Sequence, residues 1–246
     1  MADEGAVLGA LRAAILAGEF AAGQRLVEVD LCERFDSSRF AVRAAIPVLA
    51  SEGLVDVQRH RGARVRVIPF EEAIEITEVR RLLEGLTAAR AAQRVTAAQA
   101  TELQEVIKQM REAVGSAELM RYSDANAQLH ALIRTIAAHE TATGIIERLR
   151  AQMVRHQFML SLVPGRPTVS LGQHERIVAA ILARDPDGAE AAMRDHITSV
   201  IDSLNNLPTA QARTGQASRA RAGRAQARTG EAGRAQAGRA QTSTGR

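Results

Sequence analysis

Only one short region of this chain alternates between apolar and polar residues as a β-strand does. The alternation runs through residues 54–57 and again through residues 63–67, and the basic turn 58–62 separates the two stretches. Two alternating stretches joined by a short turn that contains glycine predict a β-hairpin. Elsewhere between residues 7 and 204 the apolar residues recur with helical spacing, so we expect a mainly α protein with one hairpin.

Three short helices are predicted ahead of this hairpin. Apolar residues form a helical stripe in Val7–Leu16, and a second stripe covers Val29–Phe35. The polar run 36–38 then supplies an N-cap for a third helix, which begins near Arg39 and ends before Gly53. Three helices followed by a hairpin make a winged helix-turn-helix, which we place in residues 1–68.

The region that follows Pro69 is predicted to be an antiparallel bundle of six helices in residues 69–208. The helical patterns are separated by short polar, proline-containing or glycine-containing connections. Short connections favour antiparallel neighbours. The six predicted helices are Phe70–Arg94, Ala97–Val114, Ala117–Ala138, Thr141–Leu162, Val169–Arg184 and Pro186–Leu204.

The last residues, 209–246, differ from the rest of the chain in composition. They consist almost wholly of Ala, Gly, Gln, Arg, Ser and Thr, and such a segment cannot bury enough apolar surface to fold, so we expect a disordered tail. Eight arginines against Glu231 give the tail a net charge of +7. Subtracting that from the +4 of the whole chain leaves −3 for the rest, so overall basicity is no evidence for DNA binding by the folded part.

Composition also disfavours several classes of protein. Cys32 is the only cysteine, so no intrachain disulfide can form, and no stretch is long and apolar enough to cross a membrane. We therefore expect a cytoplasmic protein without a membrane partner. Five Phe, one Tyr and no Trp offer few rings for stacking on unpaired bases, which disfavours a binder of single strands.

Within the N-terminal domain, positive charge is confined to one half. Residues 1–36 hold three arginines and seven acids, whereas residues 37–68 hold six arginines and two acids. Arg39 and Arg43 lie four residues apart at the start of the third helix, so they share one face. A basic helix followed by a basic hairpin turn is what a major-groove helix with a phosphate-contacting wing requires, and we therefore expect binding to double-stranded DNA.

At these positions the chain resembles the GntR family of bacterial transcriptional regulators. The resemblance rests on the segments Gly23-Gln24-Arg25-Leu26, Ser38-Arg39-Phe40-Ala41-Val42-Arg43-Ala44-Ala45, Glu52-Gly53-Leu54-Val55 and Arg61-Gly62-Ala63-Arg64-Val65. It implies that the two arginines of the third helix contact bases and phosphates and that the wing glycine lies at the minor groove. The implied DNA-binding residues are Ser38, Arg39, Phe40, Arg43, Arg59, His60, Arg61 and Gly62.

Three departures from the family pattern concern the base sequence that the third helix reads. Ala44 stands where the family usually has Glu, and Phe40-Ala41 replaces the common Thr-Pro. Phe40 is expected either to meet a thymine methyl group or to be a partly exposed packing residue. Pro47 occupies a position usually held by Arg, and we expect it to end the helix early or to kink it.

The helical domain contains polar residues suited to metal binding. Asn126 and His130 lie four residues apart on one predicted helix, while His174 and His196 fall in the last two. Spacing alone leaves two alternatives open, a metal site or unconnected core and surface residues. Residues 70–205 resemble the ligand-binding (FCD-type) domain of the FadR-like subgroup, which implies that Asn126, His130, His174 and His196 hold a divalent ion such as Zn, Ni or Mn.

The same resemblance implies a small anionic effector, a carboxylate above all, that completes the coordination of the metal. Arg80 matches an arginine that the subgroup directs into its pocket, and Arg134 is a second candidate for effector binding. The alternative for Arg80 is a surface ion pair with Glu84, four residues on.

Together these features predict a homodimeric DNA-binding regulator that binds a pseudo-palindromic operator and responds to an effector. Its resemblance implies a repressor that is bacterial and associated with the nucleoid. The sequence shows no nucleophile motif, phosphate loop or cysteine pair, so we do not expect an enzyme. The alternative is a metal-dependent helical enzyme with an appended DNA-binding head.

Overall fold

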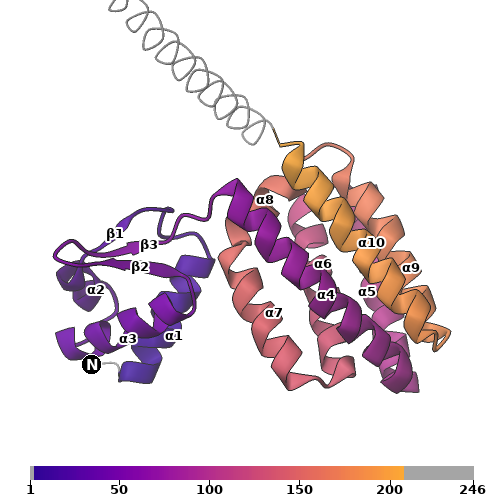
Figure 1. Cartoon of the computed structure of the whole chain (residues 1–246), viewed down its shortest axis with the longest axis horizontal. Helices are drawn as coiled ribbons and strands as arrows, with labels where there is room; N and C mark the ends of the chain where they lie inside the picture. The colour runs from indigo at the N-terminus through magenta and orange to yellow at the C-terminus, as the bar shows by residue number, and fades with distance from the viewer. Residues whose placement is uncertain (1–2, 208–246) are drawn as a thin grey trace, which may run out of the picture. The chain divides into compact units, whose positions relative to one another are not determined.

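The computed structural model describes residues 3–207, except for the side chains of Arg155 and Phe158. The predicted tail, 209–246, lies outside the described residues. Within the described range the chain forms ten helices and one three-stranded sheet (Figure 1). None of these helices is long and apolar enough to cross a membrane.

The N-terminal domain contains the three predicted helices: α1 (Glu4–Leu16), α2 (Glu28–Arg34) and α3 (Arg39–Ser51). The predicted N-cap of α3 is confirmed, because the Ser38 hydroxyl accepts a hydrogen bond from the backbone N–H of Ala41. The helices pack around one apolar core to which each contributes fully buried side chains, among them Val7, Leu11, Leu31, Val42 and Leu49.

The predicted hairpin is present as β2 (Val55–Gln58) and β3 (Gly62–Val65), with Val57 opposite Ala63. A third strand, β1 (Arg25–Leu26), pairs antiparallel with β3 and gives the sheet the order β1-β3-β2. The sequence did not predict β1, because two residues are too few to show alternation.

The expectation for Pro47 was wrong in one respect, because α3 continues past it to Ser51. Proline removes one backbone hydrogen bond, here the one that the carbonyl of Arg43 would accept. Pro47 lies on the exposed side of the helix, whereas Ala45, Ile46 and Leu49 around it are buried in the core. This burial holds the last turn in place although one hydrogen bond is missing.

Within the described residues the C-terminal domain has seven helices, one more than the six predicted. Their bounds are α4 (Phe70–Arg94), α5 (Ala97–Gly115), α6 (Leu119–Ala137), α7 (Glu140–Gln152), α8 (Val154–Ser161), α9 (Arg166–Leu182) and α10 (Pro186–Asn205). The predicted helix 141–162 is divided at Met153, whose side chain is almost completely buried. No proline or glycine marks this break, which therefore depends on packing rather than on local sequence.

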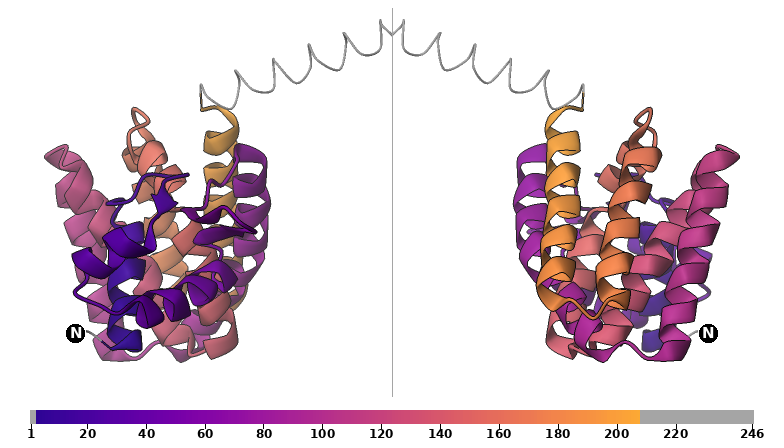
Figure 2. Two further views of the ribbon diagram at one scale, coloured as in Figure 1. Left: turned by 90° about the vertical axis from the view of Figure 1, so that its left-hand side faces the viewer. Right: turned by 90° about the vertical axis from the view of Figure 1, so that its right-hand side faces the viewer.

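Most of the long helices run alongside one another and enclose one core (Figures 1 and 2). Helix α6 packs against α4 and α5, and α9 packs against the same two helices. Apolar residues of α10, such as Met193 and Ile197, belong to the same core. Helices α6, α9 and α10 thereby present inward-facing polar residues to one another in the interior of the domain.

Candidate functional sites

The exposed face of α3 carries the residues expected to contact DNA. Arg39, Phe40, Arg43 and Pro47 are all exposed, while Ala41 and the other core positions of the helix are buried. Residues 39, 43 and 47 follow one another at intervals of four, so they form one outward stripe. Ser38 is half-buried and its hydroxyl is used for the cap, so its structural role here is to start the helix.

The two arginines of this stripe differ in their surroundings. Arg43 pairs with Glu28 of α2, with 2.8 Å between Nε and Oε2, and its side chain is still 68% exposed. Such an exposed ion pair contributes at most about 1 kcal/mol, so phosphate or guanine can readily replace Glu28 as the partner. Arg39 has no ion-pair partner among the described residues.

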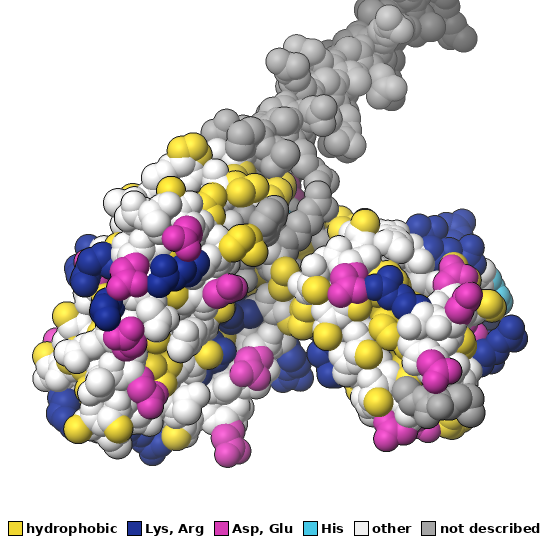
Figure 3. Space-filling model, turned by 180° about the vertical axis from the view of Figure 1, so that it is seen from behind, with side chains coloured by type: hydrophobic (Ala, Val, Ile, Leu, Met, Phe, Trp, Pro, Cys, Tyr) yellow, Lys and Arg dark blue, Asp and Glu magenta, His cyan; other side chains and the backbone are white. Residues whose placement is uncertain are grey.

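The turn between β2 and β3 presents the wing residues. Arg59, His60 and Arg61 are exposed, and basic side chains gather at one end of this domain (Figure 3). His60 and Gly62 both adopt positive φ angles, 62° and 79°, a conformation that glycine accepts without strain. By contrast, Arg64 donates a hydrogen bond to the Gly23 carbonyl, so it supports the wing.

In the C-terminal domain, three of the predicted metal ligands lie together. His130 on α6, His174 on α9 and His196 on α10 are each at most 4% exposed, and one ring nitrogen from each lies within 4.8 Å of the others. His130 Nε2 is 3.3 Å from His174 Nε2. Two nitrogens that each bind an ion at about 2.1 Å are roughly 3.0–3.4 Å apart, so this spacing suits a shared divalent ion.

Acceptors outside the cluster orient two of the three rings. His130 Nδ1 lies 2.8 Å from the Glu84 carboxylate, and His196 Nδ1 lies 2.9 Å from the side-chain oxygen of Gln173. An oxygen beside Nδ1 favours the tautomer that carries its proton there, which leaves the Nε2 lone pair for a metal ion, as is common around metal-binding histidines. Neither Glu84 nor Gln173 was predicted in this role.

Burial keeps the cluster in the protonation state that ligands need. Desolvation lowers the pKa of His174 and of His196 well below the usual value for histidine, and neighbouring positive charge acts in the same direction. Desolvation also lowers the pKa of His130, although Glu84 opposes the shift. Neutral imidazoles hold free lone pairs, which is a requirement for binding a metal ion.

Asn126 is also suited to be a metal ligand. It lies one turn before His130 on α6, and its Oδ1 atom is buried with no hydrogen-bond partner among the described residues. An unpaired buried acceptor is costly in a folded protein, and a cation or a ligand donor would satisfy it. The four predicted ligands therefore fit a divalent metal ion by their donor types and by this unpaired oxygen.

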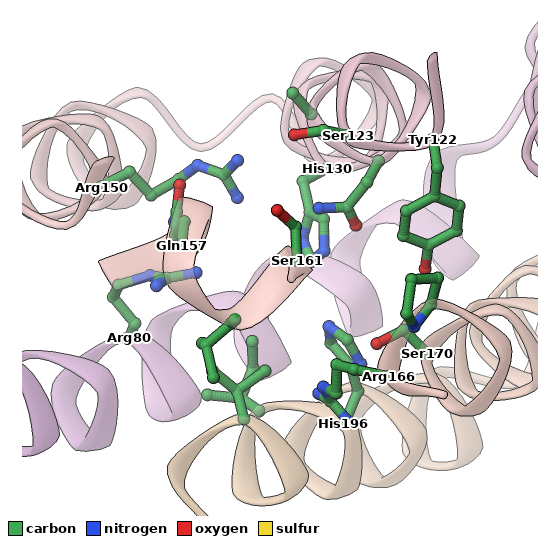
Figure 4. Close-up of a pocket in the computed structure, with 16 residues that line it drawn as sticks. Arg80, Tyr122, Ser123, His130, Arg150, Gln157, Ser161, Arg166, Ser170 and His196 are labelled. Carbon is green, nitrogen blue, oxygen red and sulfur yellow. The ribbon is translucent and has the colours of Figure 1, made fainter. Parts of the chain in front are cut away.

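A cavity of about 120 Å³ adjoins the cluster and is lined by Asn126, His130 and His196. Three arginines also line it, and Figure 4 shows Arg80 and Arg150 on one side and Arg166 on the other. A cavity of roughly 150 Å³ accommodates benzene, so this one suits a ligand of similar or smaller size.

The charge balance of the cavity favours an anion. Glu84 is buried beside Arg80, which donates hydrogen bonds to it at 2.6 and 2.9 Å. Arg150 has no acceptor within hydrogen-bond distance among the described residues, and burial lowers its pKa to about 10. Arg166 donates to the Ser199 hydroxyl at 2.8 Å. Glu84 pairs with one of the three guanidinium groups that line the cavity, that of Arg80.

The two predicted effector-binding residues have different outcomes. Arg80 lines the cavity and pairs with Glu84, the partner named in the alternative interpretation, but both side chains are buried, so this pair does not lie on the surface. Arg134 does not line the cavity, because its guanidinium lies beside Glu147 on α7, 3.9 Å away. Arg150 and Arg166 were missed, since nothing in their local sequence distinguishes them from surface arginines.

A winged helix-turn-helix with a basic outward helix, joined in one chain to a helical domain with a buried polar cavity, defines a DNA-binding transcriptional regulator. The family model described as "Bacterial regulatory proteins, gntR family" matches residues 4–65, and the FCD domain model matches residues 75–199. The chain therefore belongs to the GntR family of bacterial regulators, and its C-terminal part is an FCD domain.

Characterised relatives agree with this assignment. The HTH-type transcriptional repressor RspR of Escherichia coli is 30% identical over 76% of this chain and 82% of its own length. The HTH-type transcriptional regulator LutR of Bacillus subtilis is 29% identical over 76% of this chain and 94% of its own length. Among solved structures, E. coli McbR/YncC has a TM-score of 0.69 at 21% identity, covering 83% of this chain and 97% of that one, and shows the same fold.

Proposed function

We propose that this regulator is a repressor whose affinity for its operator is controlled by a small anionic effector, and that this effector is a carboxylate. The observation that carries the proposal is the cavity in which three arginines meet a histidine cluster. No Asp or Glu is among the described residues that line the cavity, although Glu84 pairs with Arg80 at its edge. An anion would give Arg150 an acceptor and would coordinate a divalent ion.

The metal would be held by His130, His174, His196 and Asn126 and would supply a Lewis-acidic site for one oxygen of the effector. Arg80 and Arg150 line the same cavity (Figure 4), which supports a role for both in binding another part of the anion. Asparagine is a neutral ligand, so an ion at this site keeps more positive charge than it would beside aspartate, which strengthens its attraction for an anion.

We further propose that two copies bind a pseudo-palindromic operator, each through α3 and the wing of its winged helix-turn-helix, with the domain boundary near Pro69. The family matches, which end at residue 65 and resume at residue 75, support this boundary. The name of RspR as a repressor supports the direction of control. Mobility shifts on DNA from the protein's own promoter, with and without a panel of small carboxylates, test the whole proposal. A wild-type protein with no selective, salt-sensitive shift would contradict it.

Replacing Arg150 by Gln is expected to weaken the effector by about 10- to 100-fold, because a buried charge-assisted hydrogen bond is lost. The measurement is the thermal shift that each carboxylate of the panel produces in metal-loaded protein. Arg148→Gln is the matched control, since this exposed arginine lies on the same helix outside the cavity. An unchanged shift in Arg150→Gln would remove Arg150 from the site.

Phe40 is 72% exposed in the first turn of α3, next to Arg39, and we expect it to pack against a thymine methyl group. Replacing that thymine by uracil removes one methyl, which should weaken wild-type binding by roughly fourfold at about 0.8 kcal/mol per buried carbon. Single thymine-to-uracil exchanges across the mapped operator locate the position. Phe40→Ala should lose this sensitivity, whereas equal sensitivity in both proteins would show that Phe40 reads no methyl group.

A further inference from the structure

Glu84 contacts one residue of the cavity, Arg80, and one residue of the histidine cluster, His130, through different oxygens. Its Oε1 atom accepts hydrogen bonds from Arg80 Nη2 at 2.6 Å and Arg80 Nε at 2.9 Å. Its Oε2 atom lies 2.8 Å from His130 Nδ1. The three side chains are each at most 4% exposed, so Arg80, Glu84 and His130 form a continuous buried chain of polar contacts.

Because its two oxygens contact different residues, Glu84 is not simply the acidic partner of a buried ion pair. An ion pair with Arg80 alone would be best satisfied by both oxygens facing the guanidinium. Here one oxygen is committed to the imidazole instead, and the opposite nitrogen of that ring, Nε2, faces His174 at 3.3 Å. The negative charge of Glu84 is therefore aligned, through the His130 ring, with the place where a metal ion fits.

We propose that Glu84 is a positioning residue that couples the cavity lined by the three arginines to the histidine cluster, so that an anion bound in the cavity strengthens metal binding. The inference rests on the proposed function of this cavity. Without an anion, Arg80 partly neutralises the carboxylate of Glu84, so Glu84 polarises the His130 ring less strongly. An anion in the cavity attracts the guanidinium of Arg80 and weakens its pairing with Glu84. The Glu84 carboxylate then polarises His130 more strongly, and Nε2 becomes a stronger metal ligand. By linkage, a bound metal ion strengthens anion binding to the same degree.

The coupling predicts opposite effects for neutral replacements at the two ends of the contact. Glu84→Gln keeps an acceptor beside His130 but removes the charge, so the affinity for metal should fall by about 10- to 100-fold. Arg80→Gln keeps a donor beside Glu84 but removes its competing charge, so the affinity for metal alone should rise by a few-fold, roughly three to ten. A purely structural role would lower the affinity in both variants.

The test is calorimetric titration of Zn²⁺ into metal-stripped full-length protein, without added carboxylate. Arg80→Gln and Arg166→Gln are each made in the wild type and in the Glu84→Gln background. Arg166 is the matched control, because it lines the same cavity and its positive charge lowers the pKa of His174 and of His196. We expect Arg80→Gln to tighten Zn²⁺ binding in the wild type and to do so much less in the Glu84→Gln background, while the effect of Arg166→Gln is the same in both.

An equal effect of Arg80→Gln in both backgrounds would overturn the coupling and leave the metal site standing. If wild-type protein bound no Zn²⁺, the metal site itself would fail and the coupling with it. Thermal unfolding of each metal-free variant shows whether it folds. Should Glu84→Gln not fold, Glu84→Asp replaces it as the second background, because aspartate keeps the charge but moves it away from His130. The comparison of Arg80→Gln with the wild type still shows whether loss of Arg80 raises or lowers the affinity for Zn²⁺.

Discussion

Replacing Arg39 and Arg43 together by alanine is expected to abolish selective operator binding. Both arginines lie on the exposed stripe of α3, and a good contact from an arginine to a base contributes about 1–3 kcal/mol, or roughly 5- to 150-fold in affinity for each. The double variant should therefore bind its operator no better than unrelated DNA. Fluorescence anisotropy with operator and scrambled duplexes at several salt concentrations measures both affinities.

Arg34→Ala is the control for this experiment. Arg34 belongs to α2, pairs with Glu19 and stacks on the Phe20 ring, 4.8 Å away, so its loss removes one positive charge from the domain without touching the α3 stripe. We expect only a small, sequence-independent weakening from it. If the double variant retained selectivity, or if Arg34→Ala lost as much, the proposed recognition surface on α3 would be wrong.

Removing one histidine of the buried cluster is expected to remove the metal ion. In His174→Ala only two imidazoles and the neutral Asn126 oxygen remain, and the affinity for a divalent ion should fall by more than about 100-fold. Purified wild-type protein should carry about one divalent ion per chain, and the variant should carry none. Elemental analysis after purification at neutral pH provides the measurement.

Thermal unfolding provides a second measurement of the same site. An ion that binds only the folded state raises its stability, so a chelator should lower the unfolding midpoint of the wild type and leave that of His174→Ala unchanged. His60→Ala, which removes an exposed histidine of the wing, should behave as the wild type does. A wild type that holds no ion and is indifferent to the chelator would contradict the metal site.

The winged helix-turn-helix was predictable because its signals are local. The Ser38 cap, the helical stripe of α3 and the alternation of the hairpin each lie within a few residues, and all three are confirmed. Local rules erred at Pro47, which favoured an early end or a kink whereas α3 continues to Ser51, and they did not indicate the short strand β1. Both depend on burial against, or pairing with, segments distant in sequence.

The buried cavity was predictable only in part. The chain's resemblance to a known family indicated its histidines, but periodicity alone could not show that His130, His174 and His196 meet, because they are separated by 44 and 22 residues on three helices. The roles of Glu84, Gln173 and Arg150 had no sequence signal. Each depends on which side of its helix faces the cavity.

By itself, then, the sequence determined the kind of protein: a basic capped helix and hairpin at the N-terminus, a helical domain after Pro69, and a set of histidines with metal-binding potential. Only the tertiary structure decided which of the arginines face the cavity and that Glu84 joins Arg80 to His130. The reason is physical. Helix and strand patterns arise from contacts between residues that are near neighbours in the sequence. A site is assembled by the packing of several helices, and the sequence of one helix does not determine how that helix is rotated or shifted against the others.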